Sequence, residues 1–139
     1  MVIEIPDLNY AAIFISGLLA SLLGYIWYHP KVMGQKWADA TGKKLSDVKS
    51  SPSLYIIMVT LWVISAAFYA LIIEFMDVEF EGWYFALSCL LWVAFSLPPA
   101  IMSGFYTGRS FEAISIDASY QLAGYYVFAA VHIAFLALG

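Results

Sequence analysis

The sequence predicts an all-α fold, an integral membrane four-helix bundle with both termini on the outer side (N-out/C-out). Four long apolar stretches divide the chain. Charged residues make up only 12% of it, against about 25% in a typical soluble domain. All the basic residues fall in two of the segments that connect the apolar stretches. A chain of this size exposes too much surface in water for so few charges to cover.

The four apolar stretches are each long enough to cross a bilayer, which takes about 20 mainly apolar residues. We expect them to be helices, because lipid cannot satisfy the open edge of a strand. Together they form a single transmembrane domain over residues 1–139. The spans run over about residues 8–28, 54–73, 83–103 and 116–138.

The basic residues predict the orientation. Five lysines, from Lys31 to Lys49, lie between the first and second spans, and Arg109 lies between the third and fourth. Lys/Arg excess in short loops marks the cytoplasmic face, so we expect a multi-pass protein of the cell membrane, in bacteria the inner membrane. No basic residue precedes the first span, so we expect that span to be retained rather than cleaved as a signal peptide. A net charge of −4 argues against nucleic acid as a partner.

The first span carries small residues at a spacing of four, which allow another helix to approach closely. Whether that helix belongs to the same chain or to a second copy is left open by the sequence. The residues of this stripe are Ser16, Gly17, Ala20, Ser21 and Gly24.

The first inner loop, residues 29–53, is the longest polar segment. Its apolar residues, among them Val32 and Trp37, recur at near-helical spacing up to Gly42. This pattern favours a short interfacial helix, with Lys43, Lys44 and Lys49 toward anionic headgroups. The alternative is a solvated loop whose lysines only set the topology.

The outer connection between the second and third spans, residues 74–82, is short and acidic. It makes those spans antiparallel neighbours, and it lacks the ligand spacing of a calcium loop. Trp62 and Trp92 fall near mid-membrane. We expect both to lie between helices, where the indole N–H finds an acceptor.

Pro98 and Pro99 interrupt the third span near its inner end. Each proline removes a backbone donor and clashes with the preceding turn, so we expect a kink or an early helix end. A broken helix that builds a transport site is the alternative.

The fourth span holds the ionisable residues Asp117 and His132. Asp117 shares one face with Tyr120 and Gln121. Intramembrane ionisable groups are functional candidates, but Asp117 lies close enough to the surface to cap the helix or to pair with Arg109 or a loop lysine. For His132 we favour a packing role, hydrogen-bonded to Tyr69 or Ser65, over a proton relay.

Two segments of the chain resemble a known family. The first begins at Gly24, runs through Trp27-Tyr28-His29-Pro30, and continues to Gly34, Trp37 and Gly42. The second is Ile116–Leu122 at the start of the fourth span. Both resemble the small four-span membrane proteins grouped as domain of unknown function 1761. The resemblance covers nearly the whole chain and implies a mainly bacterial multi-pass protein, with no established activity or site residues.

No cofactor, metal or catalytic set is predicted. His29 and His132 lie at opposite depths, one cysteine cannot form an intrachain disulfide, and nucleophile motifs and phosphate-binding glycine loops are absent from the sequence. We expect a packing or interaction role in a homo-oligomer, with a small ligand or lipid at the inner face as a further partner. The alternatives are an oligomeric transporter or channel for small solutes or ions, and a membrane enzyme at the inner face. The candidate functional residues are Trp27, Tyr28, His29, Trp37, Asp117, Tyr120, Gln121 and His132.

Overall fold

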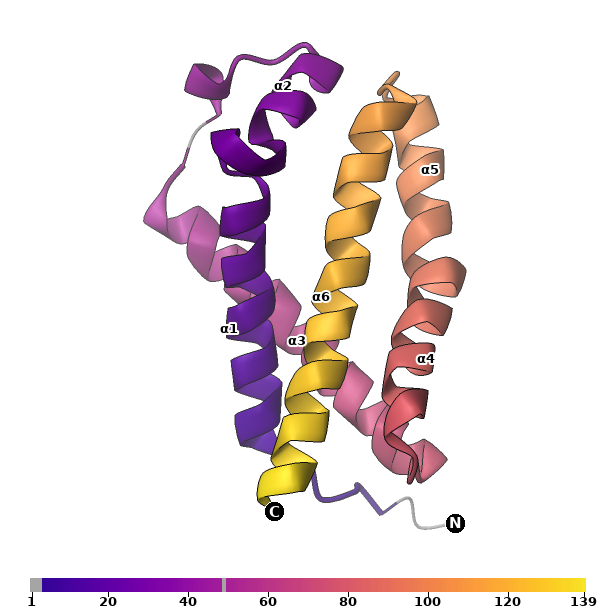
Figure 1. Ribbon diagram of the computed structural model, residues 1–139. Helices are drawn as coiled ribbons and strands as arrows, with labels where there is room; N and C mark the ends of the chain where they lie inside the picture. The colour runs from indigo at the N-terminus through magenta and orange to yellow at the C-terminus, as the bar shows by residue number, and fades with distance from the viewer. Residues whose placement is uncertain (1–3, 49) are drawn as a thin grey trace.

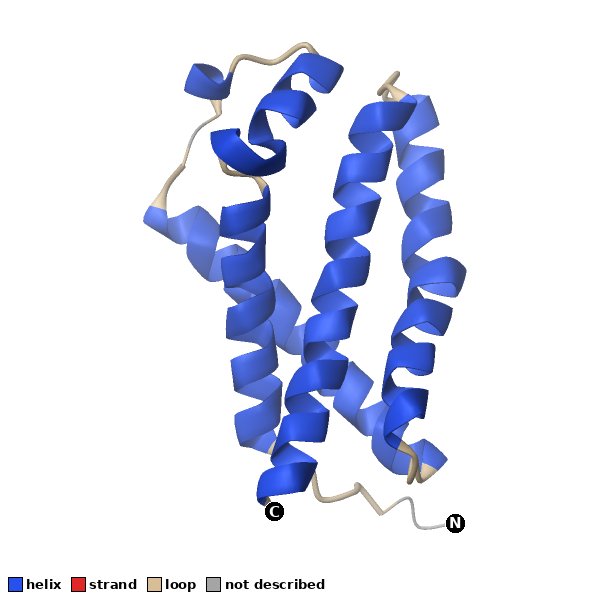
Figure 2. Cartoon of the chain, viewed as in Figure 1, coloured by secondary structure: helices blue, strands red, loops and turns tan. Residues whose placement is uncertain are grey.

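The computed structural model describes residues 4–48 and 50–139. These residues are helical apart from short connections, and none of them forms a strand (Figure 1, Figure 2). The predicted all-α fold class is therefore confirmed. Lys49, which we expected to face anionic headgroups, lies outside the described residues.

Four of the helical segments are long and apolar enough to cross a membrane, as the sequence predicted. Three are single helices: α1 (Tyr10–Trp27), α3 (Pro52–Met76) and α6 (Phe111–Leu138). The remaining span, Glu81–Tyr106, consists of α4 (Glu81–Leu91), a π turn η3 (Trp92–Ser96) and α5 (Leu97–Tyr106). The chain thus has the build of a multi-pass membrane protein.

A short helix also forms in the first long loop, as predicted. A turn η1 (Pro30–Gly34) leads into α2 (Gln35–Thr41), and a single turn η2 (Leu45–Asp47) follows. Gly42 ends α2 with φ of 70°, a left-handed conformation that glycine adopts without a steric cost.

Polar side chains begin the three single-helix spans. The side chains of Asn9, Ser51 and Ser110 accept a hydrogen bond from the backbone N–H three residues on, at Ala12, Leu54 and Ala113 respectively. These N-caps satisfy amides that the first helical turn leaves without partners. The spans α1, α3 and α6 therefore start where a capping residue precedes the apolar run.

The helix α6 lies between the other spans. It packs against α1 on one side and against α4 and α5 on the other, while α3 runs obliquely behind α1 and α6 (Figure 1). The start of α1 and the end of α6 lie at the same end of the molecule (Figure 1).

The small-residue stripe of α1 contacts two helices of the same chain. A Cβ added at Gly17 would lie 2.4 Å from Val63 Cγ2 and 2.8 Å from the Val63 Cα of α3. A Cβ at Gly24 would lie 2.3 Å from the Tyr120 hydroxyl of α6. Ser16 and Ala20 are fully buried, and the Ser21 hydroxyl donates to the Gly17 carbonyl at 2.9 Å within α1. The stripe lets α1 lie close to both α3 and α6.

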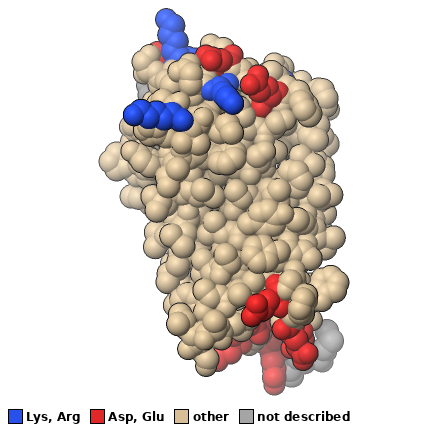
Figure 3. All heavy atoms as spheres, viewed as in Figure 1, with Lys and Arg blue, Asp and Glu red and all other residues tan. Residues whose placement is uncertain are grey.

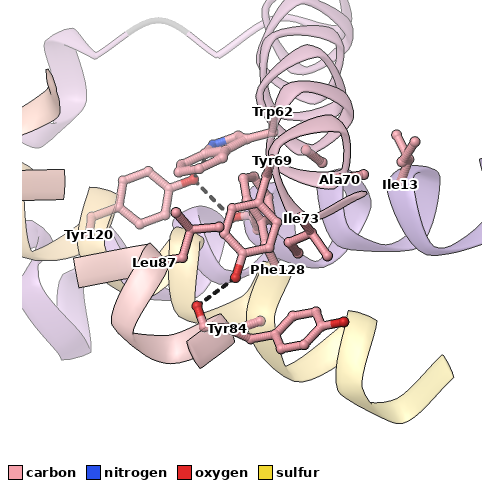
Figure 4. Packing of buried hydrophobic residues seen from close by; sticks show 12 residues of the cluster. Ile13, Trp62, Tyr69, Ala70, Ile73, Tyr84, Leu87, Tyr120 and Phe128 are labelled. Atoms are coloured by element: carbon pink, nitrogen blue, oxygen red, sulfur yellow. Dashed lines mark hydrogen bonds between the residues drawn. The ribbon is translucent and has the colours of Figure 1, made fainter. Parts of the chain in front are cut away.

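The core is rich in aromatic rings that come from α3, α4 and α6 (Figure 4). Trp62 Nε1 donates to the Tyr120 hydroxyl at 2.8 Å, and the Tyr69 hydroxyl donates to the Tyr84 carbonyl at 2.7 Å (Figure 4). Trp92 Nε1 donates to the Ala118 carbonyl at 2.8 Å. The expectation that Trp62 and Trp92 find acceptors between helices is thus confirmed.

The third span does not end at its prolines. The π turn precedes them, and the Leu97 N–H bonds to the Trp92 carbonyl five residues back. Pro98 and Pro99 then fall in the first turn of α5, where a missing N–H costs least. The wider turn absorbs the prolines, so the helix continues to Tyr106.

Charge separates the two ends of the molecule (Figure 3). We call the end with the loop helix α2 and Arg109 the basic end, although it also carries acids, and we call the opposite end the acidic end. A band without charged side chains lies between them on the face that Figure 3 shows. Which end faces the cytoplasm stays a prediction.

Candidate functional site

The candidate site lies at the basic end, where three segments of the chain meet. Tyr28 directly follows α1, Trp37 lies on α2, and Asp117 with Tyr120 and Gln121 lies near the start of α6. The structure therefore brings together five of the eight candidate functional residues around one hollow.

The turn between α1 and α2 depends on a glycine. A Cβ at Gly34 would lie 2.2 Å from the Tyr28 carbonyl oxygen, so a larger residue would collide with backbone. His29 Nδ1 accepts the Lys31 N–H at 3.1 Å and helps to shape this turn. The reversal carries Trp37 back against Tyr28, with ring centroids 6.1 Å apart and the planes at 83°. Edge-to-face contact of this kind is favourable for aromatic pairs.

Asp117 connects α6 to two other parts of the chain. The Tyr28 hydroxyl donates to its Oδ1 at 2.5 Å, and Arg109 Nη2 donates to its Oδ2 in a salt bridge. The sequence left Arg109 and the loop lysines open as partners of Asp117, and in the structure the partner is Arg109. Both side chains are only partly exposed, 33% for Arg109 and 26% for Asp117. Asp117 thus holds the end of α1 and the segment before α6 together.

Tyr28 lies just past the end of the α1 span. Burial, and then the hydrogen bond to Asp117, raise the pKa of its phenol above the usual value, because both disfavour the phenolate. Tyr28 therefore stays protonated at neutral pH and keeps donating to the carboxylate.

Tyr120 and Trp27 join the helices around the hollow. The Tyr120 hydroxyl donates to the Ala20 carbonyl at 2.9 Å while it accepts from Trp62. Trp27 Nε1 donates to the Ile116 carbonyl at 3.2 Å. The candidates Trp27 and Tyr120 therefore hold α1, α3 and α6 in register, and Tyr120 also forms part of the wall.

The hollow, which we call the basic-end cavity, has a volume of about 430 Å³. Its walls are mostly apolar, with few polar groups. The Trp37 indole nitrogen is buried and has no hydrogen-bond partner among the described residues. Leaving such a donor unpaired costs about 1–3 kcal/mol. The lining residues are Tyr28, Gly34, Trp37, Leu45, Val48, Met58, Asp117, Tyr120 and Gln121.

The two histidines stay apart, as expected from their depths. His29 is exposed at the basic end. His132 lies buried toward the acidic end, where its Nδ1 is 2.8 Å from the Phe128 carbonyl oxygen. Its ring packs on Tyr69, one of the two partners expected for it, with centroids 5.5 Å apart, but the hydrogen bond is to the backbone of its own helix. No cluster of three or more His, Cys, Asp or Glu side chains suited to a metal occurs in residues 4–48 and 50–139.

Three residues of the cavity wall were not predicted from the sequence. Leu45 and Val48 come from the loop after α2, and Met58 comes from the second turn of α3. Isolated apolar residues in a polar loop are the only signal that could have indicated such a cover.

A family model described as "Protein of unknown function (DUF1761)" matches residues 11–133. No curated protein and no solved structure matches the chain. The matched range covers most of the sequence and includes every segment of the basic-end cavity. The chain therefore belongs to the DUF1761 family.

Proposed function

We propose that this membrane protein works by binding a small molecule in the basic-end cavity, rather than by catalysis. The observation that carries the proposal is the buried Trp37 N–H, which has no acceptor among the described residues and belongs to a residue of the cavity wall. A ligand that offers an acceptor there would remove the cost of the unpaired donor.

The charge of the wall indicates what kind of molecule fits. Asp117 is paired with Arg109 and accepts a hydrogen bond from Tyr28. The carboxylate is therefore occupied, and the described residues that line the cavity include no other carboxylate or histidine. The remaining wall is aromatic and aliphatic, with the Gln121 amide as a further polar group. A mostly apolar pocket with a few polar groups is typical of small-molecule sites. A neutral molecule with a hydrogen-bond acceptor suits this wall best.

The charges also support a side of the membrane for the cavity. The basic end carries every basic residue that the structure describes (Figure 3), and Lys/Arg-rich loops face the cytoplasm. We therefore place the cavity at the cytoplasmic surface of the cell membrane.

Binding of 7-methoxycoumarin, a flat neutral molecule with a carbonyl acceptor, tests the proposal. We expect saturable binding to the protein in nanodiscs, measured by coumarin fluorescence. Trp37→Phe should weaken binding about tenfold, as expected for one lost hydrogen bond. Val48→Trp should abolish it by filling the cavity.

The matched control is Trp83→Phe, because Trp83 is 62% exposed at the acidic end. This variant should bind like the wild type. The proposal is wrong if the wild type shows no saturable binding, or if Trp37→Phe binds as tightly as the wild type.

Self-association is a second candidate, and the third span favours it. In the most apolar 18-residue stretch of Glu81–Tyr106, only 11% of the residues are buried within the chain, against 28–33% in the corresponding stretches of the other spans. A second copy would cover this face, and a transport pathway would need such a pair. Leu90→Cys in a Cys89→Ser background should then form a disulfide dimer in membranes, whereas Ile56→Cys on α3 should not. Equal crosslinking at both positions would contradict a specific interface.

A further inference from the structure

A second hollow, which we call the lateral groove, adjoins the basic-end cavity. It has a volume of about 390 Å³ and lies between α1 and α3. Ser21 and Tyr25 line it on α1, and Leu54, Tyr55 and Val59 line it on α3. The two helices touch at Gly17 and Val63, and α3 runs obliquely past α1 (Figure 1). The groove is the space that opens beyond this crossing toward the basic end.

The groove and the cavity share four wall residues that come from separate segments of the chain. These are Tyr28, Val48, Met58 and Tyr120. Hollows with that much common wall adjoin each other. Met58 at this junction is 40% exposed, and methionine is flexible enough to turn aside for a ligand.

We infer that the ligand is a neutral, lipid-like amphiphile whose headgroup occupies the basic-end cavity and whose hydrocarbon chain lies in the lateral groove. This inference rests on the proposed function and adds the chemical class of the ligand. The amphiphile reaches the site sideways from the bilayer, between α1 and α3.

We expect a neutral headgroup because the wall of the basic-end cavity carries no net charge. Arg109 and Asp117 cancel each other's charge. Lys43 lies over the Trp37 ring, 5.7 Å from its centroid, but it is not among the described residues that line the cavity. An anionic head inside the cavity would therefore meet the carboxylate with no unpaired cation among those lining residues. A carbonyl or hydroxyl oxygen can accept the Trp37 N–H, and the Gln121 amide can both donate and accept. The ester and hydroxyl groups of a monoacylglycerol provide this chemistry.

The chain lies in the groove because the groove is apolar and open to lipid. Leu54, Tyr55 and Met58 are 42%, 48% and 40% exposed, so the α3 wall faces the bilayer. A chain gains no hydrophobic energy on moving from lipid into such a groove, because both are equally apolar. The inference therefore predicts where the chain lies, and the headgroup contact supplies the affinity.

Photo-crosslinking with a monoacylglycerol that carries a diazirine in its acyl chain tests this placement. The protein is studied in phosphatidylcholine nanodiscs, and adducts are mapped by mass spectrometry. We expect adducts to concentrate on residues 21–25 of α1 and 54–59 of α3. Trp37→Phe should lower their yield about tenfold, as for one lost hydrogen bond.

Two bulky variants separate the groove from the cavity. Val59→Trp fills the lateral groove. Labelling of α1 and α3 should therefore be lost, whereas coumarin binding in the basic-end cavity should be unchanged. Val93→Trp adds the same bulk at a residue of the third span that is 55% exposed, and it should leave the adduct map unchanged.

Each outcome bears on one claim. Adducts that spread evenly over all lipid-facing helices, or that ignore Trp37→Phe, overturn the inference, while the proposed function stands if coumarin binding still needs Trp37. A phosphatidic acid probe with the same diazirine that labels the groove equally well overturns the neutral headgroup. If coumarin binding to the wild-type protein does not depend on Trp37, the proposed function itself is overturned.

Discussion

A single carboxylate, Asp117, fixes the geometry at the basic end. Its two oxygens take one bond each from Tyr28 and Arg109, which belong to parts of the chain that are distant in sequence. Hydrogen bonds to charged groups contribute about 1.5–3 kcal/mol when buried. Partial exposure of Asp117 and Arg109 lowers that value through solvent screening.

We expect Asp117→Asn and Arg109→Gln each to destabilise the protein by about 1 kcal/mol. The double variant should lose about as much as either single one, because both break the same pair. Thermal unfolding in detergent, followed by circular dichroism, measures the cycle. Glu79→Gln changes an exposed acid in the connection between α3 and α4 and should have little effect. Additive losses would show that the pair is not coupled.

Gly124 leaves room for the Trp62 ring. A Cβ there would lie 2.2 Å from the ring, which cannot turn away because Tyr120, Tyr125 and Phe128 pack around it. We expect Gly124→Ala to cost about 1–3 kcal/mol through overpacking, despite alanine's higher helix propensity. The apparent melting temperature checks this. Ala130→Val enlarges an exposed position of the same helix and serves as the control; an equal drop there would contradict the steric cause.

Single residues were predictable where the cause is local. An indole N–H in a bilayer requires an acceptor, so acceptors for Trp62 and Trp92 followed from the sequence. Which groups accept did not follow, because Tyr120 and the Ala118 carbonyl reach the rings only through helix packing. For the same reason, the sequence could not decide whether Arg109 or a loop lysine pairs with Asp117.

At the scale of elements, α2 is held to the membrane helices by Ser110. Its hydroxyl oxygen accepts the Ala113 N–H at 3.2 Å as the N-cap of α6, and the same hydroxyl donates to the Ala40 carbonyl at 2.9 Å. One side chain thus both starts α6 and fastens the end of α2 to it.

Ser110→Ala should destabilise the protein by about 1 kcal/mol, the usual value of an N-cap. It should also speed amide hydrogen exchange across α2, because the contact to Ala40 is lost. Ser115→Ala is the matched control, since the Ser115 hydroxyl bonds only to the Phe111 carbonyl of its own helix. Unchanged exchange in α2 after Ser110→Ala would mean that other contacts dock this helix.

The hydropathy pattern predicted the four spans because a helix that crosses a bilayer must be long and apolar. The π turn at Trp92–Ser96 could not be foreseen, since proline signals a break without saying how the neighbouring turn adapts. The cavity wall from Leu45, Val48 and Met58 was equally hidden, because it forms only when the loop folds back over α3.

At the scale of the whole molecule, the charge separation predicts the orientation. In a Cys89→Ser background, Glu79→Cys at the acidic end should react with a membrane-impermeant maleimide on intact cells. Ser46→Cys at the basic end should react only after the membrane is opened. The reverse pattern would place the basic-end cavity on the outer surface. Both positions are exposed, so accessibility differs only through the membrane.

The oblique course of α3 makes the molecule sensitive to bilayer thickness. With 18 residues α1 is about 27 Å long, and with 25 residues α3 is about 37 Å, against a hydrocarbon core of about 30 Å. A tilted helix spans less of the bilayer than its own length, so the oblique α3 can adapt to bilayer thickness by changing its tilt, and the near-upright α1 has less room to do so. We expect a thicker bilayer to straighten α3 along α1 and narrow the space between them, and a thinner one to widen that space. On this expectation, lipid chain length sets how far the space between α1 and α3 opens toward the bilayer.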